Sequence, residues 1–313
     1  MTGASTADRA GRPIRVGLDV GGTKIDAVAV DPSGAIRGRL RRPTGWGDDA
    51  VVESIVTAVK ALAEENGFPL ADVGSVGIGI PGLVDAEQGV VRHAVNLGLT
   101  GDSLPLRDLL SAELGTPVAV ENDANAATLG AVAHTGHGDL VYLSIGTGLA
   151  AGLAVEGRLH RGVHGAAGEV GHIPVDPQGL ACSCGQTGCL ETVASGSALA
   201  AAWPVADDYP AQALFAAAAA GDPKATAVRD RFAAGVAAAV RVLCLTVDPD
   251  TVVLGGGVAQ LGDPLRVAVA AALLDQASRA PFLAALDLAG RLRVLPSDVP
   301  VAALGAALLG RHP

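Results

Sequence analysis

The sequence lacks any uninterrupted apolar run near the roughly 20 residues that a membrane-spanning helix requires. Residues 1–13 are small and polar, with no apolar signal-peptide segment, so we expect a disordered tail there and a cytoplasmic protein without a membrane partner. Positive charge is also in deficit, because 22 Lys and Arg stand against 32 Asp and Glu, a net charge of −10. This balance argues against a general nucleic-acid binder, whose surface should be basic.

Cysteine is scarce as well, but three of the four cysteines fall within eight residues. The candidate metal ligands are His172, Cys182, Cys184 and Cys189. One imidazole and three thiolates suit a closed tetrahedral Zn²⁺ site, and Gly185 and Gly188 permit the tight turns that it needs. A disulfide is the alternative, but it would leave an odd thiol in a chain without secretion signals. We therefore predict structural zinc, and interpret Cys244 as a small buried hydrophobic residue.

The chain contains the same unit twice, a strand, a glycine turn, a second strand and a short third strand. Residues 14–40 hold the first copy, and an ungapped alignment with the second pairs Leu18 with Leu143 and Val30 with Val155. This repetition indicates an internal duplication, with one copy opening each of two lobes.

The glycine turns suggest a purpose for this unit, because glycine lets backbone N–H groups approach phosphate oxygens and threonine adds a hydroxyl donor. Plain β-hairpins are the alternative, but two equivalent turns, the first with an acid and a lysine, favour a nucleotide clamp. A third glycine turn follows the strand ending at Leu254 and suits either a nucleotide or tight strand–helix packing. The residues expected at the nucleotide are Asp19, Gly21, Gly22, Thr23 and Lys24, then Gly146, Thr147 and Gly148, then Gly255, Gly256 and Gly257.

Helical and strand patterns alternate through the rest of the chain, which predicts a mixed α/β protein with two lobes. We expect the boundary between the lobes just after Asp123, near residues 125–138. The expected parts are the tail 1–13, an N-terminal α/β lobe 14–123, a C-terminal α/β lobe 124–300 with the zinc motif 172–191, and a terminal helix 301–313 that packs back on the N-terminal lobe.

Several acidic and amide side chains are placed for chemistry. Glu121, Asn122 and Asp123 follow a strand where a helix begins, the usual place for ligand contacts in open α/β sheets. Asp123 can instead be the helix N-cap, although three adjacent polar groups exceed what capping requires. Glu169 and Glu191 flank the zinc motif, which would hold their carboxylates in place for a polar ligand; facing solvent or supporting the metal ligands are their alternative roles.

Five motifs occur in the order seen in the ROK family (repressor, open reading frame, kinase), and their combination is highly specific. They are Asp19-x-Gly-Gly-Thr-Lys24, Glu121-Asn-Asp123, Gly146-Thr-Gly148, Gly168-Glu-x-Gly-His172 and Cys182-x-Cys-Gly-x-x-Gly-Cys-x-Glu191. The resemblance covers about residues 14–310. It implies a two-lobed actin-like ATPase (ribonuclease H-like) fold with duplicated β-hairpin phosphate loops and a zinc-binding insertion. It also implies ATP-dependent phosphorylation of a sugar by a homodimer or homotetramer.

The same resemblance implies a role for each motif. Asp123 would be the general base for the attacking sugar hydroxyl, Asp19 would lie near Mg²⁺, and the three glycine turns would enclose ATP. The residues that we expect around the sugar are Gly82, Asn96, Asn122, Asp123, Glu169, His172 and Glu191. Phosphoryl transfer requires mainly positioning, charge neutralisation by Mg²⁺ and a base near the nucleophile, and these residues supply each of them.

The sequence also departs from the family pattern. Ala150 and Ala151 follow the second turn, where the family is usually richer in glycine, and their methyl groups would narrow the approach to the phosphates. Many family glucokinases carry tryptophan where this chain has residues 96–99 and Leu190, so glucose, N-acetylglucosamine and N-acetylmannosamine are all candidates for phosphorylation at the 6-hydroxyl. Only 13 residues precede the first strand, too few for the helix-turn-helix domain of repressors. A non-catalytic sugar-sensing regulator is the alternative function.

Overall fold

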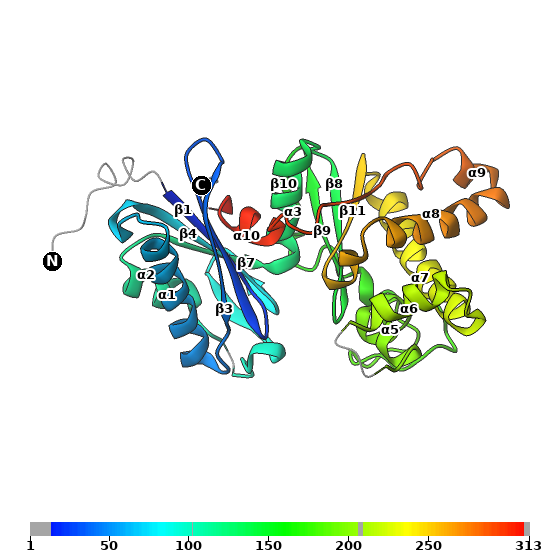
Figure 1. Ribbon diagram of the computed structural model, residues 1–313, viewed down its shortest axis with the longest axis horizontal. Coiled ribbons are helices and arrows are strands. Elements are labelled where there is room, and N and C mark those ends of the chain that lie inside the picture. The colour runs from blue at the N-terminus through cyan, green and yellow to red at the C-terminus, as the bar shows by residue number, and fades with distance from the viewer. Residues whose placement is uncertain (1–13, 102, 206–208, 310–313) are drawn as a thin grey trace. The chain divides into compact units, whose positions relative to one another are not determined.

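The computed structural model describes residues 14–101, 103–205 and 209–309 (Figure 1). The expected tail 1–13 lies outside the described residues. Two compact units make up the chain: unit 1 is the described part of Met1–Gly136 with Pro300–Pro313, and unit 2 is His137–Val299. The division after Gly136 falls within the expected boundary region 125–138. The second unit begins at His137, whereas the expected C-terminal lobe began at residue 124.

Unit 1 is built on a five-stranded sheet with the strand order β3-β2-β1-β4-β7. Strand β1 pairs antiparallel with β2 and parallel with β4, and β4 pairs parallel with β7. The strands are β1 (Ile14–Val20), β2 (Lys24–Val30), β3 (Ile36–Pro43), β4 (Val73–Ile80) and β7 (Val118–Asn122).

Unit 2 contains a second five-stranded sheet, ordered β10-β9-β8-β11-β12. Its strands are β8 (Leu140–Ile145), β9 (Leu149–Val155), β10 (Arg158–Leu159), β11 (Thr251–Gly255) and β12 (Leu292–Val294). Strand β8 pairs antiparallel with β9 and parallel with β11, and β11 pairs parallel with β12. The two sheets therefore match strand for strand in order and direction, which confirms the duplicated hairpins.

The ungapped alignment of the two copies fails after the turn. Four residues separate the last paired positions of the first hairpin and three separate those of the second. Val30 pairs with Arg15, and Ala154 pairs with Leu140, the counterpart of Arg15. Val30 therefore corresponds to Ala154, and both are buried, whereas Val155 is 43% exposed. The pairing of Val30 with Val155 was wrong because the second turn is one residue shorter.

Helices cover both faces of the first sheet (Figure 1). On one face α1 (Asp48–Glu65) and α2 (Leu106–Leu114) join a core that includes Ile25, Ala27 and Ala29 of β2. The alternate β2 residues Val28 and Val30 point to the other face, since strand side chains alternate, and pack against α10 (Val301–Ala306). Helix α10 also packs on α3 (Asp123–Thr135). In this structure the terminal helix lies in unit 1, together with α3.

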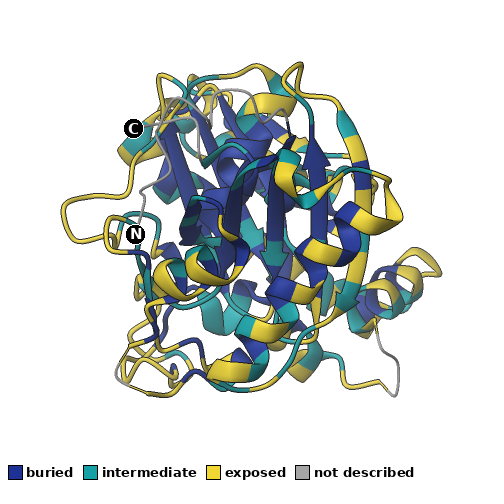
Figure 2. Ribbon diagram, turned by 90° about the vertical axis from the view of Figure 1, so that its left-hand side faces the viewer, coloured by how far each residue is buried: buried dark blue, intermediate teal, exposed yellow. Residues whose placement is uncertain are grey.

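Unit 2 places its long helix α7 (Pro223–Val247) at the centre of its hydrophobic core. The other helices are α4 (Glu191–Ala194), α5 (Gly196–Ala202), α6 (Pro210–Ala219), α8 (Asp263–Ser278) and α9 (Pro281–Ala284). Figure 2 shows the strands as buried and the outer helix faces as exposed. Helix α7 contacts α4, α6 and α8, so it connects the elements that carry the candidate site of this unit.

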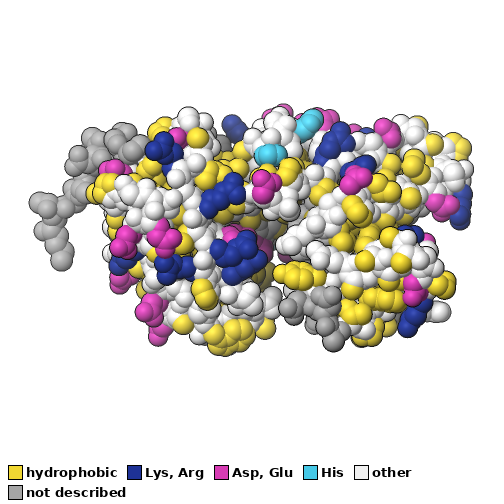
Figure 3. All heavy atoms as spheres, viewed as in Figure 1, with side chains coloured by type: hydrophobic (Ala, Val, Ile, Leu, Met, Phe, Trp, Pro, Cys, Tyr) yellow, Lys and Arg dark blue, Asp and Glu magenta, His cyan; other side chains and the backbone are white. Residues whose placement is uncertain are grey.

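Short elements complete the chain. They are the hairpin strands β5 (Leu83–Asp85) and β6 (Val90–Arg92) and the 3₁₀ turns η2 (Leu70–Asp72), η3 (Val95–Leu97), η4 (Val170–His172) and η5 (Gly257–Leu261). Within the described ranges, every helix is too short or too polar to cross a lipid bilayer. Acidic and basic side chains are interspersed on the face shown in Figure 3.

Candidate functional site

The candidate residues of unit 1 gather at the carboxyl ends of three adjacent parallel strands. Asp19 lies near the end of β1, Gly82 follows β4, and Asp123 follows β7. Because β4 pairs with both β1 and β7, these three ends lie along one edge of the sheet. Ligands of open α/β sheets bind at this edge, so tertiary structure brings together the motifs that the sequence separates.

Asn122 is the N-cap of α3. Its Oδ1 accepts hydrogen bonds from the backbone N–H groups of Ala124 at 3.0 Å and Asn125 at 3.4 Å, and its Nδ2 donates to the Gly82 carbonyl oxygen at 3.4 Å. The N-cap is therefore Asn122 and not Asp123, although Asp123 Oδ1 also accepts from the Ala124 N–H at 2.8 Å. Asp123 is the first residue of α3, and the helix has its N-cap in Asn122 without it.

Glu121 supports this strand–helix junction from the protein interior. Only 2% of the residue is exposed, and its Oε1 accepts from the Asn122 N–H and from Asn125 Nδ2, each at 3.0 Å. A buried carboxylate is stable only when such donors compensate for its lost hydration. Glu121 therefore holds the polypeptide that presents Asp123. The sequence reasoning gave Glu121 no role of its own.

Asp19 has a strongly perturbed carboxyl group. The pKa of Asp19 is raised from 3.8 to about 7, because burial, first, and then the charges of Asp123 and Asp26 outweigh the lowering by Lys24. A partly buried carboxyl beside a second carboxylate is the environment in which a divalent cation relieves charge repulsion. Carboxylate oxygens are also ligands that Mg²⁺ accepts, so these residues fit the expected cation.

The second glycine turn, Gly146–Gly148, is braced by Glu191. Glu191 Oε2 accepts from the Leu149 N–H at 3.0 Å, and a Cβ atom at Gly148 would lie 2.5 Å from this oxygen. A side chain at position 148 would therefore displace this carboxylate from the turn. Glu191 was expected to contact a sugar, and in unit 2 it connects the zinc motif to the second turn.

A cavity of about 330 Å³ lies beside this turn within unit 2. Gly146 and Thr147 form part of its wall, and the start of α5, the start of α6 and η5 form the rest. The additional lining residues include Ser197, Leu199, Tyr209, Gln212, Val258 and Gln260. Its volume falls within the range of small-molecule sites, and the mixture of apolar walls and amide groups suits a heteroaromatic base.

Gly255, the last residue of β11, and the two glycines after it have different roles. A Cβ atom at Gly255 would lie 2.0 Å from the Tyr142 ring, and the Gly256 N–H donates to Tyr142 Oη at 3.2 Å. These two glycines therefore serve close packing, which was one of the two roles left open. Gly257 lines the cavity and has open space around it.

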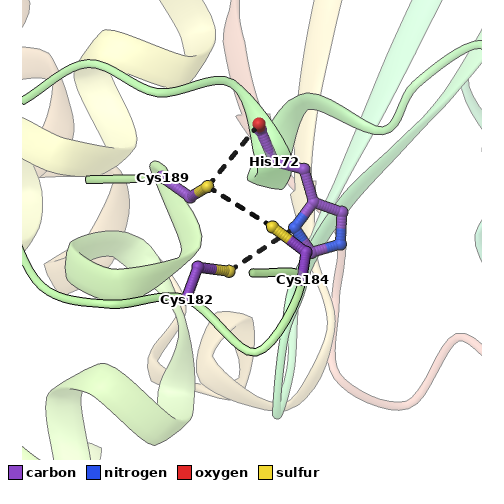
Figure 4. A group of neighbouring side chains, drawn as sticks. All are labelled: His172, Cys182, Cys184 and Cys189. Carbon is purple, nitrogen blue, oxygen red and sulfur yellow. Dashed lines mark hydrogen bonds between the residues drawn. The ribbon is translucent and has the colours of Figure 1, made fainter. Parts of the chain in front are cut away.

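The four predicted zinc ligands converge in unit 2 (Figure 4). Their ligand atoms all lie within 4.8 Å of one another, with 3.8 Å between Cys184 Sγ and Cys189 Sγ and 3.7 Å between Cys182 Sγ and His172 Nδ1. Tetrahedral zinc with Zn–S near 2.3 Å and Zn–N near 2.0 Å requires about 3.8 Å between two sulfurs and about 3.5 Å between sulfur and nitrogen. The donor set and its spacing therefore fit a zinc ion. Coordination through Nδ1 leaves His172 Nε2 as a hydrogen-bond donor.

The thiols of this cluster differ in acidity. Hydrogen bonds from Gln186 lower the pKa of Cys184 to about 6, and the side-chain bond, from Nε2 to Sγ, measures 3.4 Å. Burial and the neighbouring cysteines raise the pKa of Cys189 to about 12. Three adjacent thiolates need a cation to offset their repulsion, and Zn²⁺ binding displaces their protons.

Comparison with known proteins identifies the family of the chain. The model of the ROK family matches residues 15–308. The chain belongs to the ROK family. It is 36% identical over 272 residues to a glucokinase of Halalkalibacterium halodurans, covering 80% of this chain and 82% of that protein. It is also 34% identical over 256 residues to an N-acetylmannosamine kinase of Vibrio vulnificus, covering 77% of this chain and 82% of that protein.

A solved ROK structure extends the match to the whole fold. The ROK family glucokinase of Streptomyces griseus, crystallised with glucose and AMPPNP, has a TM-score of 0.76 and 33% identity, covering 95% of this chain and 99% of that one. The two duplicated sheets therefore form the actin-like ATPase fold that the ROK motifs implied.

The backbone of the ROK motif around Glu169 packs closely against β9. Gly168 has a φ of +94°, and a Cβ atom there would lie 1.8 Å from the Ala151 carbonyl oxygen, while the Ala151 N–H donates to the Gly168 carbonyl at 2.8 Å. Glu169 is exposed and half-buried His172 ends the following turn. Ala150 and Ala151 lie in β9, paired with β8, rather than within the glycine turn.

Several residues of the candidate site escaped sequence reasoning. Ser197, Tyr209, Gln212 and Gln260 line the cavity but carry no local motif, since they come from three separate segments. Gly196 lies next to this wall, because its N–H donates to the Gly146 carbonyl oxygen at 2.7 Å. Without the fold, nothing in the sequence links this glycine to the second turn.

Proposed function

We propose that this ROK protein is an ATP-dependent kinase that transfers the γ-phosphate to the 6-hydroxyl of a hexose. The observation that carries the proposal is the position of Asp123, which heads α3 beside Asp19 while Asn122 is the N-cap. A carboxylate in that position accepts a proton from a substrate hydroxyl, and the neighbouring acidic group suits the cation of a metal–nucleotide complex.

Unit 1 supplies the acid–base chemistry in this proposal. Asp123 takes the proton of the sugar 6-hydroxyl as that oxygen attacks phosphorus. Glu121 and Asn122 hold the junction that aims Asp123, and Gly82 is tied to it through Asn122. Mg²⁺ near Asp19 would neutralise the charge that develops on the transferred phosphoryl group. Gly21, Gly22, Thr23 and Lys24 would contact phosphate oxygens.

Unit 2 supplies nucleotide and sugar contacts. We assign the cavity beside Gly146 to the adenosine part of ATP, with Thr147 at its phosphate end and Gly257 in its wall. A structural zinc ion would hold His172 and, two residues beyond Cys189, Glu191. With Glu169, these side chains would bind sugar hydroxyls, His172 through its Nε2–H. Glu191 would do so while its Oε2 braces the second turn.

Glucose and the N-acetylhexosamines remain the two candidate sugar classes, N-acetylglucosamine and N-acetylmannosamine being the acetylated ones. Glucokinases and N-acetylmannosamine kinases are both similar to this chain to a comparable degree. The absence of the two family tryptophans leaves room for an acetamido group beside Glu191 and His172. We also expect a homodimer or homotetramer, which light scattering would measure.

A coupled assay of ADP release over a panel of sugars tests the proposal. We expect turnover with glucose or an N-acetylhexosamine and none with the 6-deoxy form of the accepted sugar, because that form lacks the nucleophile. Sites built around hydroxyl hydrogen bonds also reject analogues that lack them by about 10⁴–10⁵-fold. Absence of ADP release despite measurable sugar binding would support the alternative, a non-catalytic sugar-sensing regulator. Equal ADP release with the 6-deoxy sugar would show that the 6-hydroxyl is not the acceptor.

A further inference from the structure

An exposed tryptophan lies against the segment that carries Asn96. The Trp46 side chain is 69% exposed, unusually high for so large an apolar group. Its indole lies on Gly98, where φ is +73° and a Cβ atom would lie 2.7 Å from both Nε1 and Cε2 of the ring. The glycine at position 98 thus lets the indole approach the backbone of this segment directly.

The contact is reinforced by the backbone next to Trp46. The Gly47 N–H donates to the Leu97 carbonyl oxygen at 2.8 Å, and Leu97 is fully buried. Ala94, at the start of this segment, packs closely as well, because a Cβ atom at Gly82 would lie 3.0 Å from it. The indole and these backbone contacts therefore hold residues 94–98 from two directions.

The same segment forms a wall of the first phosphate turn. A Cβ atom at Gly22 would lie 2.6 Å from the Asn96 carbonyl oxygen and 3.3 Å from Asn96 Cβ. Asn96 itself is exposed to solvent. The preceding residue, Val95, is an exposed apolar side chain at 65%, as on a surface that receives a ligand with apolar faces.

We propose that Trp46 is a positioning residue for the sugar, because its indole presses residues 95–98 against the first phosphate turn and so sets the place of Asn96. The inference rests on the proposed function, in which Asn96 contacts the sugar and Gly22 the phosphates. It also accounts for the segment 96–99, which lacks the tryptophan of many family glucokinases. Here an indole reaches that segment from a different part of the chain.

Kinetics of Trp46 variants test this role. Trp46→Ala is expected to lower kcat/KM for the accepted sugar by about 10–100-fold, the cost of a misplacement on the scale of 1 Å, with most of the loss in the KM for sugar. The KM for ATP should rise less than the KM for sugar in this variant, because the adenosine part of ATP is assigned to unit 2 and only its phosphates would adjoin Gly22. Trp46→Phe keeps a ring on Gly98 and should recover most of the loss, which a general packing defect would not predict.

Fluorescence provides a second measurement that does not require turnover. The chain has two tryptophans, so Trp203→Phe leaves Trp46 as the sole indole. Trp203 lies at the end of α5 in unit 2, and among the described residues no atom accepts a hydrogen bond from its Nε1, so phenylalanine is a conservative replacement. Titration with glucose and N-acetylmannosamine, without ATP, should change the Trp46 emission saturably for the accepted sugar.

The outcomes separate the two proposals. A folded Trp46→Ala protein with the wild-type KM for sugar would overturn the positioning role while leaving the kinase intact. If the wild type phosphorylates no sugar, the proposed function fails, and the titration alone then decides whether this segment meets a sugar. An emission that no sugar alters would contradict the inference in either case.

Discussion

The charge of Asp123 raises the pKa of Asp19. Burial is the largest cause of the shift to about 7, and Asp123 is the largest contribution from a neighbouring charge. The two residues are about one hundred positions apart in the sequence, at the ends of β1 and β7. Their repulsion shows that the first glycine turn and the Glu121–Asp123 motif form one electrostatic site within unit 1.

Asp19→Asn should therefore stabilise the protein at alkaline pH while abolishing its activity. The folded state holds the Asp19 proton up to about pH 7, whereas the unfolded chain releases it near 3.8, so stability falls as the pH rises between these values. The variant lacks this penalty and should gain about 1–3 kcal/mol above pH 7, and almost nothing near pH 4. Thermal unfolding at pH 4 and pH 8 measures both. An equal gain at the two pH values would contradict the assigned cause.

Asp123→Asn should leave the fold intact and reduce kcat by about 10²–10⁴-fold, the usual cost of removing a general base. Stability should change little because the Asn122 cap remains. Steady-state kinetics and sugar-binding calorimetry distinguish catalysis from affinity. Asp108→Asn, an exposed change on α2, is the matched control and should behave as the wild type. Near-normal turnover of Asp123→Asn would place the base elsewhere.

Cys184→Ser should release zinc and with it the activity, because His172 and Glu191 lose their common anchor. Elemental analysis of purified protein should find one zinc per chain in the wild type and little in the variant. Cys244→Ala provides the control, since Cys244 is buried in α7 and outside the cluster, and it should keep its zinc. Fully active wild-type protein without zinc would exclude an essential metal site.

Gly146→Val should raise the KM for ATP far more than the KM for sugar. A Cβ atom at Gly146 meets no atom of the described residues within 4 Å, so the added side chain would enter the space assigned to the nucleotide. Gly256→Val is a poor test of the same idea, because a Cβ atom there would lie 2.6 Å from the Ile145 carbonyl oxygen. We expect Gly256→Val to have a lower unfolding temperature than the wild type, and Gly146→Val to have the same unfolding temperature as the wild type. Equal effects of Gly146→Val on both KM values would make the turn a purely structural element.

Local patterns predicted many elements well. Helix α2 ends at Leu114 because the next residue, Gly115 with a φ of +61°, is a glycine of the kind that stops helices. The glycine turns and the two hairpins appear where the repeat placed them. The ungapped alignment failed because a single residue is missing from the second turn, and a one-residue difference moves each side chain to the opposite face of a strand. The burial of Ala154 instead of Val155 records this shift.

The sequence by itself determined the features whose parts lie close together along the chain. The three cysteines fall within eight residues and His172 is ten residues away from the first, so a short loop suffices to bring four donors together. The glycine turns and the Glu121–Asp123 motif are also local, since each is a strand end with its turn or helix start.

Only the tertiary structure decided which distant segments meet. Glu191 under the second turn, the cavity wall from α5, α6 and η5, and Trp46 on Gly98 each join segments that no local pattern relates. These contacts depend on strand order and on the side of the sheet that each helix covers. Hydrophobic periodicity specifies which face of an element is buried, but the partner of that face is set by the packing of the whole unit.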